Sequence, residues 1–174
     1  MYSKPILTIF TLVLLLLINS RTFSQSEVLY DGEELYYEVD YSFLNIGWAK
    51  FNTDKVPGKE NFFITKAKLK SNTSLPIVDV DYDFISEIEL KNGKMIPHKF
   101  TAYQYKDGKK STLITIFNHD SAFISLYITG YDGNVEVDTK IPTSTVFQDG
   151  LSIFYYARYN TPKTRTEYVP VIMH

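Results

Sequence analysis

Three aspartates at alternate positions partly match a metal-binding motif. Asp79, Asp81 and Asp83 have the spacing of the first three oxygen ligands of a calcium-binding loop. Such a loop also needs glycine at its sixth position, for a sharp turn, and a bidentate glutamate at its twelfth. Phe84 and Leu90 occupy those positions here. We therefore predict no metal ion and interpret the aspartates as the charged start of a strand.

The histidines do not form a ligand pattern either. His98, His119 and His174 show neither the His-x-His nor the His-Glu-x-x-His spacing of zinc sites. His119 stands between Asn118 and Asp120, which are residue types that favour turns. We interpret the histidines as structural residues and predict no cofactor.

Covalent catalysis would need an activated nucleophile, and the sequence offers no pattern for one. The chain has no cysteine, it lacks a Gly-x-Ser-x-Gly turn, and Ser152 lies at the expected start of a helix. The glycine-rich loops that hold nucleotides and phosphates are also missing. We predict no catalytic residue and a protein that is not an enzyme.

Aromatic side chains are the remaining candidates for a binding function. The chain contains 14 Tyr, 12 Phe and 1 Trp, residue types that favour the half-buried surface of a pleated sheet. In a curled sheet they would line an apolar groove, although core packing accounts for the same residues. We single out Trp48 and Tyr155 as candidate ligand-binding residues.

Alternation with a period of two predicts the strands that would position these side chains. The segments 34–41 and 61–70 alternate in this way, and the second has a basic outer face. Asn92-Gly93 predicts a tight hairpin, and two later Asp-Gly pairs repeat the signal, so 82–140 is predicted to form five consecutive strands. The predicted fold class is all-β: a single antiparallel, curled, half-barrel-like sheet.

One short helix is expected to pack on this sheet. The segment 149–159 has a helical apolar face and begins at Asp149, which is suited to cap the helix N-terminus. Arg158 lies on the apolar face, where a lone charge would be costly. We predict structural roles for Asp149 and Arg158, with Arg158 paired to a strand carboxylate such as Glu34 or Glu38.

The first 24 residues predict an exported chain. Lys4 precedes the apolar run Ile6–Ile18, which is shorter than the roughly 20 residues of a membrane-spanning helix. We predict a signal peptide over 1–24 and a single β-rich domain over 25–174 that is periplasmic or secreted, with no permanent membrane span. The alternative is an uncleaved anchor flanked by Arg21. A lipoprotein signal is excluded because it needs a cysteine.

Charge and the final residues limit the possible partners. Removal of 1–24 leaves 16 basic and 20 acidic side chains, a net charge of −4, without a dense basic cluster. We therefore predict no nucleic-acid partner. The segment 166–173 has a strand pattern in which Pro170 suits only a sheet edge. Either the sheet ends there on an open edge, or the domain is truncated.

Four segments together resemble one known family. They are Gly32-Glu33-Glu34-Leu35-Tyr36-Tyr37-Glu38-Val39, Ile46-Gly47-Trp48-Ala49, Ile96-Pro97-His98-Lys99-Phe100 and Asp149-Gly150-Leu151-Ser152-Ile153-Phe154-Tyr155-Tyr156-Ala157-Arg158. In this order they are similar to the exported bacterial family called domain of unknown function 3108. The resemblance implies a signal peptide and a β-rich periplasmic domain without an assigned activity. Family domains generally continue through further strands, and this sequence departs from that pattern at its end.

Two functions are compatible with these observations. The first is a non-catalytic envelope protein that binds a lipid or another hydrophobic ligand in an apolar groove. The second is a structural or interaction module that pairs with a protein partner through an exposed edge strand. An open, aromatic concavity would favour the first, and a filled interior with a bare edge would favour the second.

Overall fold

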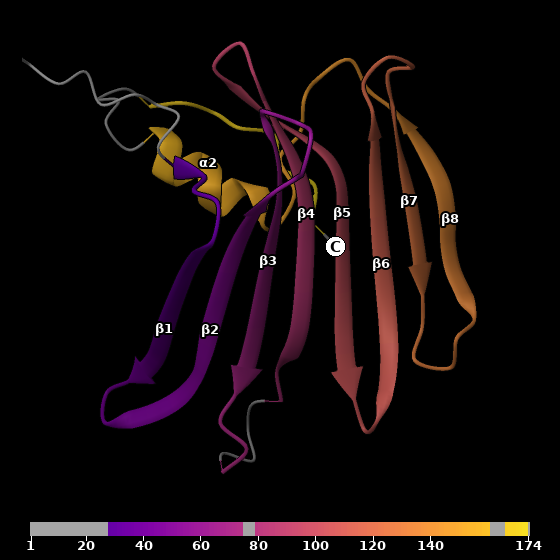
Figure 1. Cartoon of the computed structure of the whole chain (residues 1–174). Helices are drawn as coiled ribbons and strands as arrows, with labels where there is room; N and C mark the ends of the chain where they lie inside the picture. Colours follow the sequence, from indigo (N-terminus) through magenta and orange to yellow (C-terminus); the bar gives the residue numbers. More distant parts are fainter. Residues whose placement is uncertain (1–27, 75–78, 161–165, 174) are drawn as a thin grey trace, which may run out of the picture.

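The protein forms one open antiparallel sheet with a short helix on one face. The structure is a computed structural model that describes residues 28–74, 79–160 and 166–173. The sheet has eight strands in chain order and is not closed into a barrel, as Figure 1 shows. The elements are β1 Glu33–Tyr41, β2 Leu44–Lys55, β3 Phe62–Ser71, β4 Asp81–Lys91, β5 Lys94–Lys106, β6 Lys109–Asn118, β7 Phe123–Thr129, β8 Val135–Pro142 and α2 Ser152–Asn160.

This architecture confirms the predicted fold class and the five strands expected over 82–140. The chain order follows from short connections, since a turn of two residues can join only antiparallel neighbours. Asn92 and Gly93 have φ values of 52° and 70°, and Asp107 and Gly108 have values of 51° and 71°. Positive φ at both central positions matches the right-handed twist of the strands, which is why Asn-Gly and Asp-Gly mark these hairpins.

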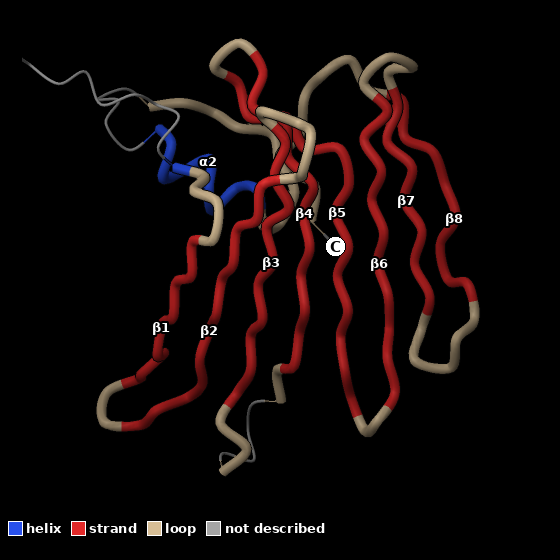
Figure 2. The backbone as a smooth tube through the Cα atoms, in the orientation of Figure 1, coloured by secondary structure: helices blue, strands red, loops and turns tan. Residues whose placement is uncertain are grey.

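The core lies between α2 and one face of the sheet. Because side chains alternate along a strand, the register places Thr53, Thr65 and Ser86 beside one another on this helix-bearing face. In Figure 2 the helix lies near one end of the strands. The buried apolar side chains that hold it there are Leu29, Phe63, Ala67, Ile88, Met95, Phe100, Phe117, Ile124, Leu151, Tyr155 and Tyr159.

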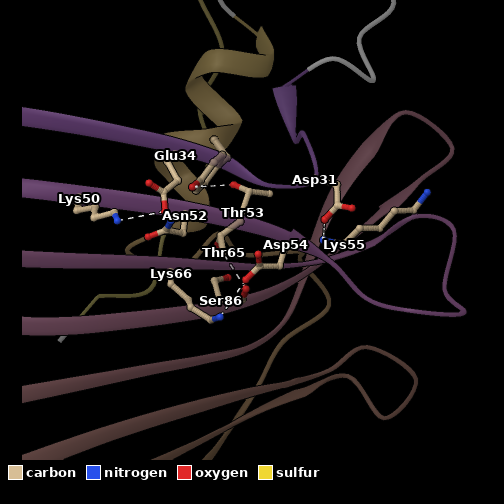
Figure 3. A network of polar contacts seen from close by, with 11 residues as sticks. Asp31, Glu34, Lys50, Asn52, Thr53, Asp54, Lys55, Thr65, Lys66 and Ser86 are labelled. Atoms are coloured by element: carbon tan, nitrogen blue, oxygen red, sulfur yellow. Dashed lines mark hydrogen bonds and ion pairs between the residues drawn. The ribbon is translucent and has the colours of Figure 1, made fainter.

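The opposite face is polar, as the alternation in 61–70 predicts. Lysines of β3 form ion pairs with the neighbouring strands, and Lys66 Nζ lies 2.9 Å from Asp54 Oδ2. Glu34 likewise accepts hydrogen bonds from Lys50 at 3.1 Å and Asn52 at 2.7 Å, as Figure 3 shows. This face is therefore a solvated ladder of alternating charges.

The predicted edge strand over 166–173 is wrong. Val171 forms only an isolated parallel bridge with Gln148, in which Gln148 donates to Pro170 O and Ile172 donates to Gln148 O, both at 2.9 Å. Pro170 has no N–H to donate, so it cannot continue a ladder in both directions. The segment instead lies along the chain just before α2.

The predicted signal peptide over 1–24 lies outside the described residues, as does the beginning of the predicted domain over 25–174. Among the described residues, no helix is long and apolar enough to cross a membrane.

Candidate functional site

Asp149 lies at the start of α2 and is fully buried. Its Oδ1 atom accepts hydrogen bonds from the backbone N–H groups of Leu151 at 2.8 Å and Ser152 at 2.7 Å. Its Oδ2 atom accepts the hydroxyl of Ser86 on β4 at 2.6 Å. This is N-cap geometry, and it also attaches the helix to the sheet. Burial raises the pKa of Asp149, and the four hydrogen bonds with Ser152, Ser86 and Leu151 oppose that rise.

Ser152 completes the cap. The backbone N–H of Asp149 donates to Ser152 Oγ at 2.8 Å, so the two residues cap one another reciprocally. The hydroxyl of Ser152 is buried in this arrangement. It therefore acts as a structural acceptor at the helix start.

Arg158 pairs with Glu33, and not with Glu34 or Glu38. Its Nη1 and Nη2 atoms donate to Glu33 Oε2 at 3.0 Å and Oε1 at 2.7 Å. The prediction of a strand carboxylate partner was right in kind and wrong in the residue. Glu34 and Glu38 are on the opposite face, because they differ from Glu33 by an odd number of positions.

The ion pair is backed by aromatic rings. The guanidinium carbon of Arg158 lies 5.8 Å from the ring centre of Phe154 and 5.7 Å from that of Tyr155. The hydrogen bond with Glu33, more than any other interaction, raises the pKa of Arg158. The side chains of Arg158 and Glu33 keep 31% and 13% of their surface exposed, so water screens the pair only in part.

Replacing Arg158 by Ala should lower the free energy of unfolding by about 2 kcal/mol, less than for a fully buried pair. The matched control is Lys50→Ala, which removes an exposed ion pair with Glu34 and should change stability by less than about 0.5 kcal/mol. Urea unfolding followed by circular dichroism measures both. Equal stability of the Arg158→Ala protein and the wild type would show that the pair does not support the fold.

Tyr155 lies at the centre of the helix–sheet contact. It is fully buried, and the hydroxyl of Thr53 on β2 donates to the Tyr155 oxygen at 3.1 Å. Burial raises the pKa of Tyr155. Its ring therefore fills the interior and does not line an open concavity.

Trp48 lies on the other face of the sheet. Phe51 and Thr53 of the same strand face α2, and Trp48 is an odd number of positions away from both. Its ring packs on Tyr36 with 6.0 Å between ring centres. The structure therefore does not bring Trp48 and Tyr155 together, and one groove lined by both is not present.

Two histidines that are distant in the sequence meet at one end of the sheet. His98 Nε2 lies 2.9 Å from Glu89 Oε2, and His119 Nε2 lies 2.7 Å from the carbonyl oxygen of Pro97. The two imidazole centres are 5.4 Å apart, beside a cavity of about 410 Å³. The pair could not be predicted from the sequence, because the register shift between Glu87 and Ile88 leaves His98 without a register partner, and His119 comes from a turn.

The three aspartates Asp79, Asp81 and Asp83 line a cavity of about 440 Å³. A lysine occupies the place of a cation, because Lys68 Nζ lies 2.9 Å from Asp83 Oδ1 and 3.8 Å from Asp81 Oδ1. Among the described residues, no three His, Asp or Glu side chains are arranged to hold a metal ion. We therefore still interpret these aspartates as the charged start of strand β4.

The edge strand β1 carries four exposed apolar side chains, which alternate in part with acidic ones. In the described part of the chain it has a strand partner, β2, on one side only. Tyr36, Tyr37, Val39 and Tyr41 are exposed by 59%, 45%, 42% and 74%. The outer edge of β1 also presents backbone N–H and C=O groups that can pair with another strand. Exposed apolar side chains on both faces of such an edge favour that pairing.

In the comparison with family models, residues 36–171 match the family described as protein of unknown function (DUF3108). This chain belongs to the DUF3108 family. No curated protein and no solved structure matches it. The matched region of this DUF3108 protein runs from the exposed strand β1 to Val171, and it includes both α2 and the histidine pair.

Proposed function

We propose that this DUF3108 protein is an exported, non-catalytic interaction module that pairs with a protein partner through strand β1. The observation that carries the proposal is the row of exposed apolar side chains on β1, whose outer edge has no strand partner among the described residues. Pairing of this kind adds a strand to the sheet, with main-chain hydrogen bonds giving affinity and alternate side chains giving specificity.

The two edges of the sheet differ in how they are protected. Strand β8 carries Lys140 and ends at Pro142, and lysine and proline are common devices against unwanted edge pairing. Strand β1 contains neither lysine nor proline, and its charged side chains are all acidic. The two edges are of similar length, nine residues in β1 and eight in β8, so their difference lies in residue type and not in length. We therefore assign the pairing role to β1 and not to β8.

Export and the absence of catalysis are supported indirectly. The apolar run Ile6–Ile18 has the length of the apolar core of a signal peptide. His98 and His119 are bonded to a carboxylate and a backbone carbonyl, which suits a structural role. A periplasmic or secreted location places β1 where envelope proteins could reach it.

Lysine at position 39 should abolish pairing without unfolding the protein. The Val39→Lys side chain would place a charge on the pairing edge, and an exposed position changes stability by less than about 0.5 kcal/mol. The control is Val135→Lys on β8, whose valine is 54% exposed.

Cross-linking in cells measures the pairing. A photo-reactive amino acid replaces Tyr37 in bacteria that produce the chain, and it forms a covalent adduct with a partner that contacts β1.

We expect one cross-linked adduct at Tyr37 that disappears with Val39→Lys and persists with Val135→Lys. Mass spectrometry of the adduct identifies the partner. An adduct that survives Val39→Lys would place the contact away from the β1 edge, and its absence in the wild-type background would count against pairing altogether.

A hydrophobic ligand is the second candidate, on residues other than those singled out from the sequence. Tyr82 and Phe84 stack with 5.5 Å between ring centres on the helix-bearing face, and with Leu69 and Leu113 they are only partly buried. Solvent extraction of the purified protein followed by mass spectrometry tests this candidate. A stoichiometric lipid would favour it over strand pairing.

A further inference from the structure

We propose that the tip of the β1–β2 hairpin, residues Tyr41 to Leu44, inserts into the interface of a lipid bilayer. The proposal goes beyond strand pairing, because it concerns the end of the hairpin and not its edge. It rests on three observations: the exposure of the tip, the chemistry of its turn, and its aromatic and apolar composition.

The tip carries the most exposed large apolar side chain that belongs to a hairpin turn. Phe43 is 89% exposed, and Tyr41 and Leu44 beside it are 74% and 42% exposed. A single exposed apolar residue is ordinary, but three neighbours at one tip form a patch. Figure 1 shows this hairpin at the end of the strands that is away from α2, so the patch does not contact the core.

The turn itself does not call for a phenylalanine. Tyr41 and Leu44 are register partners, so Ser42 and Phe43 form the two-residue loop. Ser42 has a φ of 57°, a conformation for which the other two-residue hairpins use Asn-Gly and Asp-Gly. Glycine or asparagine would suit this φ better than serine, and nothing in the turn geometry selects phenylalanine at position 43. The residues at this tip are therefore better explained by an external contact than by hairpin stability.

The composition of the tip favours a lipid surface over a protein pocket. Tyrosine prefers the boundary between headgroups and acyl chains, which accommodates both its apolar ring and its hydroxyl. Phenylalanine and leucine suit the apolar layer just beneath that boundary. A narrow, convex tip also suits a deformable surface, which needs no preformed pocket.

Carboxylates next to the tip limit how deeply it can insert and which lipids it should prefer. Asp40 directly precedes Tyr41 and accepts a hydrogen bond from Asn45 Nδ2 at 2.9 Å, and Glu38 lies two positions earlier. Carboxylates resist transfer into hydrocarbon, so insertion should stop at Tyr41. They also repel anionic headgroups. Binding should therefore be at least as strong on phosphatidylcholine as on phosphatidylglycerol.

Tryptophan placed at the tip reports insertion directly. In the full chain, Phe43→Trp combined with Trp48→Phe leaves one tryptophan, and vesicles of phosphatidylcholine brominated on its acyl chains quench a ring that enters the bilayer. The matched control combines Val135→Trp with Trp48→Phe on the opposite edge. Because both variants keep the apolar N-terminal segment, that segment cannot account for a difference between them.

We expect a blue shift and loss of fluorescence for Phe43→Trp, with neither for Val135→Trp. Equal quenching of the two, no quenching of Phe43→Trp, or quenching that requires phosphatidylglycerol would overturn the proposal. An unquenched tip that cross-links to a protein in cells, from a photo-reactive residue in place of Phe43, would assign the patch to a protein partner instead.

Discussion

Replacing Tyr155 by Ala should lower the free energy of unfolding by about 3–5 kcal/mol, the cost of deleting a buried aromatic ring. Tyr155 is fully buried, and its ring lies perpendicular to that of Phe154 with 5.4 Å between ring centres. The space left behind would lie beneath α2, against a sheet that cannot collapse to fill it. Urea unfolding followed by the fluorescence of Trp48 measures the loss.

Tyr155→Phe is the matched control for the ring. It removes only the hydrogen bond with Thr53, and we expect a loss of about 0.5–1.5 kcal/mol. If Tyr155→Ala were no more destabilising than Tyr155→Phe, the ring would contribute little, and the interior beneath α2 could not be the filled core described above.

Replacing Asp149 by Ala should cost about 2–4 kcal/mol, because the helix loses its cap and buried donors lose their acceptor. The donors are the hydroxyl of Ser86 and the backbone N–H groups of Leu151 and Ser152. Asp149→Asn keeps an oxygen acceptor for the two backbone groups and should be much milder. The same unfolding experiment compares the two variants.

The carboxylate of Asp149 also predicts a pH dependence. Burial raises its pKa above the ordinary value of 3.8, so between that value and the native pKa the folded state holds more protons than the unfolded chain. Stability from this group is then highest in acid and declines as the pH rises through that window. The decline should be absent in Asp149→Asn. An equal pH profile for both proteins would contradict the raised pKa.

Much of the fold could be predicted from local patterns. Alternation and the Asn-Gly and Asp-Gly pairs led to an antiparallel sheet in chain order, and Asp149 stands at the helix start as its residue type suggested. These features depend on neighbours in the sequence, so they require no knowledge of the tertiary structure. The segment 166–173 shows where such local patterns fail. It has the residue pattern of a strand, but it forms only an isolated bridge with Gln148.

The contacts of the candidate site could not be predicted from the sequence, because they depend on the face of the sheet that each residue occupies. A shift of one position separates Glu33, the true partner of Arg158, from Glu34, and an odd spacing separates Trp48 from the residues that face α2. The register shift in β4–β5 further changed the position of His98 relative to Glu89. None of these relations is visible until the strands are paired and the helix is placed.

The exposed edge likewise has no signature in the sequence. Strand β1 alternates like a strand with one wet face, and only the sheet order reveals that its outer side has no strand partner among the described residues. Its tyrosines were therefore expected in a half-buried sheet surface and instead lie exposed.

Amide hydrogen exchange of the complex tests the central claim most directly. The partner cross-linked at Tyr37 would be purified and mixed with the full chain, and exchange would be compared with that of the chain alone. We predict slowed exchange in β1, Glu33–Tyr41, and no change in β8. Unchanged exchange in β1, or protection confined to β8 or to α2, would contradict the assignment of β1 as the pairing edge.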